Sequence, residues 1–82
     1  MEEIRYEAYD VTWKILGNEK RLEKLRKIAD SNAWLYVKYE KVNNIITAVC
    51  REQKIKLSDD EHGVTMRFLL EKLERRGIVF YV

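Results

Sequence analysis

The chain of 82 residues has no proline, a single cysteine and only three glycines. With Cys50 alone, no disulfide can form within the chain, and this fits a reducing compartment, so we expect the protein in the cytoplasm. Gly17, Gly63 and Gly77 are the residues most able to interrupt regular structure. They are therefore the best marks of where one element ends and the next begins.

Long apolar runs and a large excess of one charge are also missing. No run approaches the roughly 20 apolar residues that span a bilayer, and no signal peptide is visible, so we expect no membrane partner. The net charge is only +2, so any basic patch must arise from local clustering. The length predicts one domain over residues 1–82. So small a domain has a thin core, which it must use well or share with a partner.

The N-terminal segment 3–16 has two apolar stripes at helical spacing, although part of it also alternates as a strand would. We favour a helix. One stripe comprises Ile4, Ala8, Val11 and Ile15. The other comprises Tyr6, Tyr9, Trp13 and Leu16. A helix with two apolar faces covers the core with one and needs a partner for the other, so the second stripe is the predicted interface of a homodimer.

The middle of the chain predicts a helix and then a short strand. Asn18 can cap a helix over 19–30, whose outer face alternates in charge. The following segment, 34–41, is aromatic and β-branched and predicts a strand or an extended arm.

The C-terminal half predicts two helices and a strand. Residues 42–53 keep the spacing of a helix with one buried face, on which Cys50 is a small core residue. Ser58 and Glu61 match a capping box, so the next helix begins near Asp59, or near Val64 if Gly63 interrupts it. It ends at Gly77, and the composition of 78–82 is that of a strand.

This order of elements predicts an α+β, mainly α fold: a helix-turn-helix over about 42–76 with a truncated wing. The segment from Thr65 to Val79, with Leu70 and Leu73 followed by Gly77-Ile78-Val79, is similar to the recognition helix and wing strand of winged-helix regulators. The segment from Lys14 to Leu25 resembles the one that precedes the helix-turn-helix in ArsR-type regulators. Those sensors often bind metal through paired cysteines, which this chain lacks, so the resemblance implies DNA binding without the metal site.

The leading functional hypothesis is a small transcriptional regulator that occupies a double-stranded DNA operator as a homodimer. A helix held by one buried face presents its other face to the major groove. On the last helix, Arg67 is predicted to pair with guanine edges or phosphate, and Lys72 and Arg75 with phosphate. The full predicted set is Thr65, Arg67, Phe68, Lys72 and Arg75, with Lys41, Lys54 and Lys56 flanking the turn.

A protein–protein interaction module is the alternative hypothesis. Val64 and Phe68 would be exposed on the face proposed to read bases, and an apolar residue there packs equally well on another protein. Residues 59–61 are acidic where DNA phosphate would repel them. Stacking of the exposed aromatic residues on single-stranded bases is a lesser possibility than packing.

Catalytic and cofactor chemistry find no support in the sequence. No nucleophile, base and acid set, glycine-rich phosphate loop or CxxC pair is present, so we expect neither an enzyme nor a cofactor. Four adjacent residues of the capping-box segment, Asp59 to His62, rarely converge on one ion, so we expect no metal site either.

Overall fold

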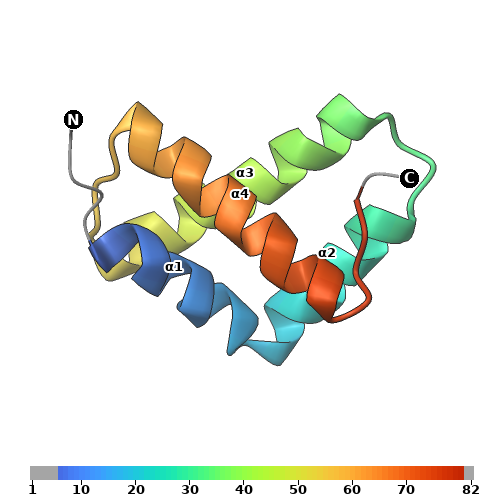
Figure 1. Cartoon of the computed structure of the whole chain (residues 1–82), viewed down its shortest axis with the longest axis horizontal. Coiled ribbons are helices and arrows are strands. Elements are labelled where there is room, and N and C mark those ends of the chain that lie inside the picture. The colour runs from blue at the N-terminus through green and yellow to red at the C-terminus, as the bar shows by residue number, and fades with distance from the viewer. Residues whose placement is uncertain (1–5, 81–82) are drawn as a thin grey trace.

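The computed structural model describes residues 6–80, and every regular element within them is an α-helix (Figure 1). The helices are α1 (Tyr6–Leu16), α2 (Glu19–Asp30), α3 (Leu35–Gln53) and α4 (Asp59–Arg75). The protein is therefore a small helical bundle, and the predicted α+β fold with a winged-helix architecture is wrong.

The N-terminal segment is a helix in its described part, as favoured. α1 buries Ala8, Val11 and Ile15 and ends at Leu16, directly before Gly17. Asn18 then caps α2 by accepting a hydrogen bond from the backbone N–H of Arg21 at 3.0 Å, which confirms the predicted cap. Two helices in close succession result, joined by a turn of two residues.

The strand predicted over 34–41 does not exist, because α3 begins at Leu35. The β-favouring residues there sit at helical spacing with Val42, which is fully buried. A lone extended arm would leave its backbone groups without partners, whereas a helix satisfies them internally. The Lys38 ammonium also donates to the Ala29 carbonyl at 2.7 Å, which ties the start of α3 to the end of α2.

The turn between α3 and α4 follows the prediction closely. Lys54 ends α3 in the left-handed conformation, with φ of 56°. The Ser58 hydroxyl accepts from the Glu61 N–H at 3.2 Å, and the Glu61 carboxylate accepts from the Ser58 N–H at 3.0 Å. This capping box starts α4 at Asp59, and the helix continues through Gly63 without interruption.

The C-terminal segment folds back on the helices rather than forming a wing. Gly77 has φ of 81°, and the Ile78 N–H donates to the Leu73 carbonyl at 2.9 Å, which closes the end of α4. Ile78 and Phe80 are each 3% exposed in the core. No strand occurs between residues 6 and 80, and the last two residues of the predicted strand lie outside the described part. Burial of apolar side chains against helices thus replaces sheet pairing here.

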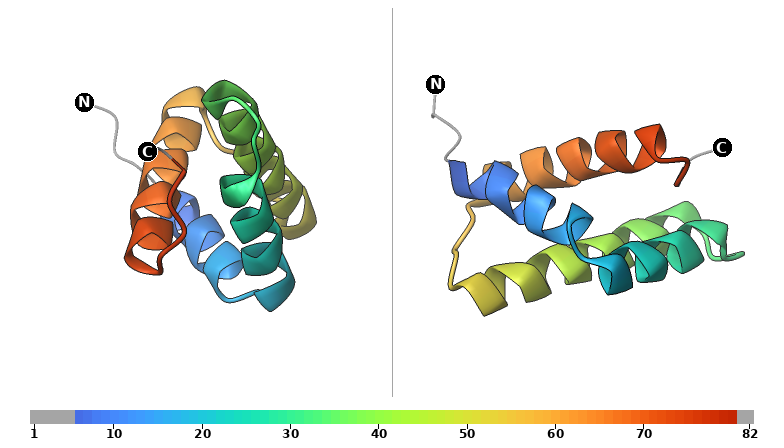
Figure 2. Two further views of the ribbon diagram at one scale, coloured as in Figure 1. Left: turned by 90° about the vertical axis from the view of Figure 1, so that its right-hand side faces the viewer. Right: turned by 90° about the horizontal axis from the view of Figure 1, so that it is seen from below.

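The four helices form two layers around one core. In the right-hand view of Figure 2, α1 and α4 lie above α2 and α3. α1 contacts each of the other helices. The core draws on all four helices, and its largest fully buried side chains include Ile15, Leu25, Ile46, Leu69 and Leu73. The arrangement leaves two opposite outer faces, one on each layer.

Candidate nucleic-acid interface

Thr65 does not face solvent, as a base-reading residue must. It is fully buried, and its hydroxyl donates to the carbonyls of Glu61 at 2.7 Å and Ala8 at 3.1 Å. The hydroxyl thus joins α4 to α1. The prediction of Thr65 as a DNA contact is wrong, because the buried stripe of α4 includes polar residues that apolar periodicity does not count.

Phe68 and Lys72 are also engaged with α1. The Phe68 ring packs edge-to-face on Tyr9 and Trp13, with centroids 5.3 and 5.8 Å apart. The Lys72 ammonium lies 5.1 Å from the centroid of Phe68 and 5.6 Å from that of Trp13, a cation–π arrangement. This side of α4 is therefore an inter-helix seam rather than an open reading face.

Arg67 and Arg75 are exposed on α4, but the helix as a whole carries more acidic than basic residues. α4 carries three Lys and Arg residues against five Asp and Glu residues. Glu61 is the buried member of the acidic group. A surface that approaches phosphates needs the opposite balance. Two of the five predicted contacts on α4 thus remain accessible, on a helix whose charge disfavours DNA.

Charge is divided between the two layers. The segment 19–56, which contains α2 and α3, has ten Lys and Arg residues against five Asp and Glu residues. Residues 6–16 and 58–77, which contain α1 and α4, have five against seven. The α2–α3 layer is therefore the positive side of the molecule, although the net charge of the chain is small.

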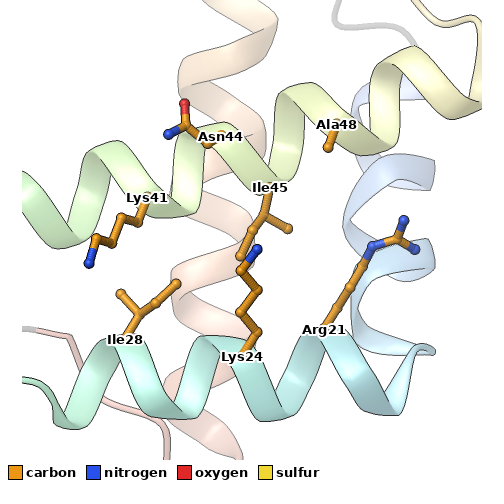
Figure 3. A pocket seen from close by; sticks show the side chains of 7 residues that line it. All are labelled: Arg21, Lys24, Ile28, Lys41, Asn44, Ile45 and Ala48. Carbon is orange, nitrogen blue, oxygen red and sulfur yellow. The ribbon is translucent and has the colours of Figure 1, made fainter.

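A groove runs between α2 and α3 on this positive side. It has a volume of about 550 Å³, and Arg21, Lys24, Ile28, Lys41, Asn44, Ile45 and Ala48 line it (Figure 3). In this view α4 passes behind α2 and α3, so the groove opens on the side away from α4. The floor is apolar and the rim carries cations.

The cations of the groove differ in their partners. Arg21 forms an ion pair with Glu52 across the groove. Lys24 extends from α2 toward α3 and Lys41 from α3 toward α2, as Figure 3 shows. Neither lysine has an ion-pair partner among the described residues. Two ammonium groups without an ion-pair partner among the described residues thus lie along an apolar floor, which suits a ligand with both negative charge and apolar surface.

The outer face of α3 continues this surface with small polar groups. Asn43 and Asn44 are exposed and Thr47 is half-buried one turn on, with Arg51 exposed a turn further. Of the three lysines predicted around the turn, Lys41 lies in the groove, and Lys54 and Lys56 are exposed beyond the end of α3. The structure therefore brings Lys41 together with α2, for whose outer face the sequence predicts only an alternation of charge. The missed signal was the helical spacing of Arg21, Lys24 and Ile28 on one face of α2.

The predicted dimer residues divide into an exposed group and a buried one. Tyr6, Tyr9 and Trp13 are 89%, 36% and 50% exposed. Leu16 is 4% exposed and belongs to the core, so its assignment to a dimer interface is wrong. The two-sided character of α1 comes from its aromatic residues alone.

Metal-ligating and thiol groups in the described part of the chain can be considered in turn. No three His, Cys, Asp or Glu side chains within it gather as metal ligands would. Cys50 is buried, as predicted, and desolvation raises the pKa of its thiol, which keeps it in the unreactive neutral form. Within residues 6–80, no helix has both the length and the apolarity needed to cross a membrane.

Comparison of the chain with protein-family models, curated proteins and solved structures gives no match. The resemblance to ArsR-type regulators thus gains no support beyond the residues that suggested it.

Proposed function

We propose that the protein binds double-stranded DNA with its α2–α3 face. The observation that carries the proposal is the separation of charge between the layers, with ten basic against five acidic residues in the segment 19–56. Neutralisation of phosphates by Lys and Arg supplies most of the affinity of DNA-binding proteins. The proposal moves the predicted interface from α4 to the opposite layer.

The groove and the outer face of α3 have complementary roles in this proposal. Lys24 and Lys41 contact phosphates along one strand, and the sugars pack on the apolar floor at Ile28 and Ile45. Asn43 and Arg51 lie on the exposed face of α3, where an amide suits adenine and a guanidinium suits guanine. Phosphate contacts position the protein and α3 supplies sequence preference.

The proposal retains further parts of the original expectation. Two copies act together, the protein works in the cytoplasm, and it regulates transcription by occupying DNA. The exposed aromatic residues of α1 support the pairing of two copies, and the single cysteine supports a reducing compartment. Regulation of transcription rests on the proposed DNA binding.

Charge reversal in the two layers tests the interface. The double variant Lys24→Glu with Lys41→Glu alters the groove, and Arg67→Glu with Arg75→Glu makes the same change of charge on α4. A labelled duplex of random sequence is titrated at two salt concentrations. We expect the groove variant to lose at least about tenfold in affinity. Its slope of log K against log salt should be shallower by about two, since each phosphate contact contributes about 0.9 to that slope. The α4 variant should stay within about threefold.

Three results would overturn the proposal. They are no binding by the parent protein at low salt, an affinity that does not depend on salt, and a larger loss in the α4 variant than in the groove variant. Circular dichroism checks that all variants remain helical. The third result would restore α4 as the binding helix.

A protein–protein interaction module remains the second candidate function, without the winged-helix fold first attached to it. The exposure of Tyr6, Tyr9 and Trp13 on one helix favours it. It would take the place of DNA binding if the parent protein and the groove variant bound DNA equally weakly.

A further inference from the structure

The outer side of the α1–α4 layer carries a cluster of aromatic residues that we call the aromatic face. It consists of Tyr6, Tyr9 and Trp13 of α1 with Val64, Phe68 and Lys72 of α4. The rings of Tyr9, Trp13 and Phe68 fix one another edge-to-face, so they form a preformed surface. Half of Trp13 is exposed to solvent on it. Rigid, exposed aromatic surface of this kind is typical of protein interfaces.

The charges around the aromatic face are arranged so that it complements itself. α1 and α4 run parallel, because Ala8 meets Thr65 near their starts and Trp13 meets Lys72 further on. Near the start of α1, Glu7 and Asp10 line a hollow of about 480 Å³ together with Tyr6, Tyr9 and Trp13.

The other end of the aromatic face is basic. Lys14 lies there on α1, and Lys72 and Arg75 lie there on α4, with Glu71 as the acidic exception. A two-fold axis through the middle would place the acidic end of one copy on the basic end of the other. Such isologous contact is the commonest way in which identical chains pair.

The area of the aromatic face sets the strength of this contact. Helices of 11 and 17 residues are about 16 and 25 Å long, and two packed helices are about 18–20 Å wide. The face therefore offers roughly 400–500 Å² per copy, below the ~800 Å² of a standard interface. Dimerisation should therefore be weak and should depend on concentration.

We propose that the aromatic face binds the aromatic face of a second copy, and that the resulting dimer bridges two DNA duplexes. The groove opens away from α4, and the aromatic face lies on the layer that contains α4 (Figures 2 and 3). Pairing through the aromatic faces therefore directs the two α2–α3 faces outward in opposite directions. The bridging part rests on the proposed DNA binding, whereas the dimer does not.

Light scattering over a range of concentrations tests the dimer alone. Trp13→Ala should weaken dimerisation at least about tenfold. Trp34→Ala is the matched control, because Trp34 is 75% exposed but lies at the start of α3. A parent protein that stays monomeric to about millimolar concentration would overturn the proposal, and so would equal effects of the two substitutions.

Charge exchange tests the antiparallel arrangement of the two copies. Asp10→Lys and Arg75→Glu should each weaken the dimer several-fold by placing like charges together across the axis. The chain that carries both substitutions should regain most of the lost affinity, since the charges are then exchanged in both copies. Failure of the double variant to recover would exclude this pairing.

Capture of one duplex by another tests bridging. A duplex on beads is mixed with protein and a fluorescent duplex of the same sequence. The parent protein should retain the fluorescent duplex, and Trp13→Ala should lose at least about tenfold in retention while binding a single duplex as the parent does. A dimeric parent that binds DNA but retains no second duplex would overturn bridging. If no duplex binds at all, the DNA proposal fails and light scattering still decides on the dimer.

Discussion

Two buried threonines, one on α1 and one on α4, differ in whether their hydroxyls find a partner. The Thr65 hydroxyl donates to a carbonyl of α4 and to one of α1, whereas Thr12 Oγ1 is buried without a partner in the described structure. Loss of a satisfied group costs more than loss of an unsatisfied one. Thr65→Val should therefore lower the free energy of unfolding by about 1–2 kcal/mol, and Thr12→Val should leave it unchanged or raise it by up to about 1 kcal/mol.

Urea denaturation of the two variants, at concentrations where the protein is monomeric, measures this difference. A larger destabilisation by Thr12→Val than by Thr65→Val would contradict the hydrogen bonds described here. The comparison also explains an error of sequence interpretation. Thr65 was placed on the open face of its helix because periodicity was judged from apolar residues, yet the polar residues Glu61 and Thr65 lie on the buried stripe with Leu69 and Leu73.

At the scale of elements, two glycines near the ends of α4 should respond oppositely to alanine. A Cβ added at Gly63 meets nothing within 4 Å, and the residue lies inside the helix. Gly63→Ala should stabilise the protein by about 0.5–1 kcal/mol, because alanine loses less backbone entropy on folding. Gly77 has φ of 81°, so Gly77→Ala should destabilise by about 1–2 kcal/mol.

Thermal unfolding followed by circular dichroism distinguishes the two glycine variants by the sign of the shift in Tm. A fall in Tm for Gly63→Ala would mean that α4 is interrupted there, as the sequence left open. Local signals predicted this helix well, since the Ser58–Glu61 capping box and Gly77 lie at its two ends. They failed for 34–41 and 78–82, because aromatic and β-branched residues form strands only where another strand is available to pair with them. In the described chain, packing on helices takes that role.

For the whole molecule, the sequence predicted neither the location nor most of the residues of the proposed DNA-binding groove, since Lys41 is the one predicted contact that lines it. A charge of +2 for the chain concealed a positive α2–α3 layer and a mildly negative α1–α4 layer. On the groove rim, Arg21 and Lys24 come from α2 and Lys41 comes from α3. Only the packing of the two helices brings these residues to opposite sides of one groove. The aromatic residues of α1 were recognised as a second face, but the direction in which that face points depends on the layers.

The opposite direction of the two faces leads to a last prediction, about salt. In a dimer that bridges two duplexes, each duplex contacts one α2–α3 face, so binding of a single short duplex involves the same phosphates with or without dimerisation. The phosphate contacts of Lys24 and Lys41 alone should make log K fall against log salt with a slope of about −1.8. The parent protein and Trp13→Ala should give equal slopes. A dimer that placed both faces on one duplex would instead give the parent about twice the slope of the variant. Titration of one duplex at four salt concentrations, with protein above and below the dimerisation range, separates these two arrangements.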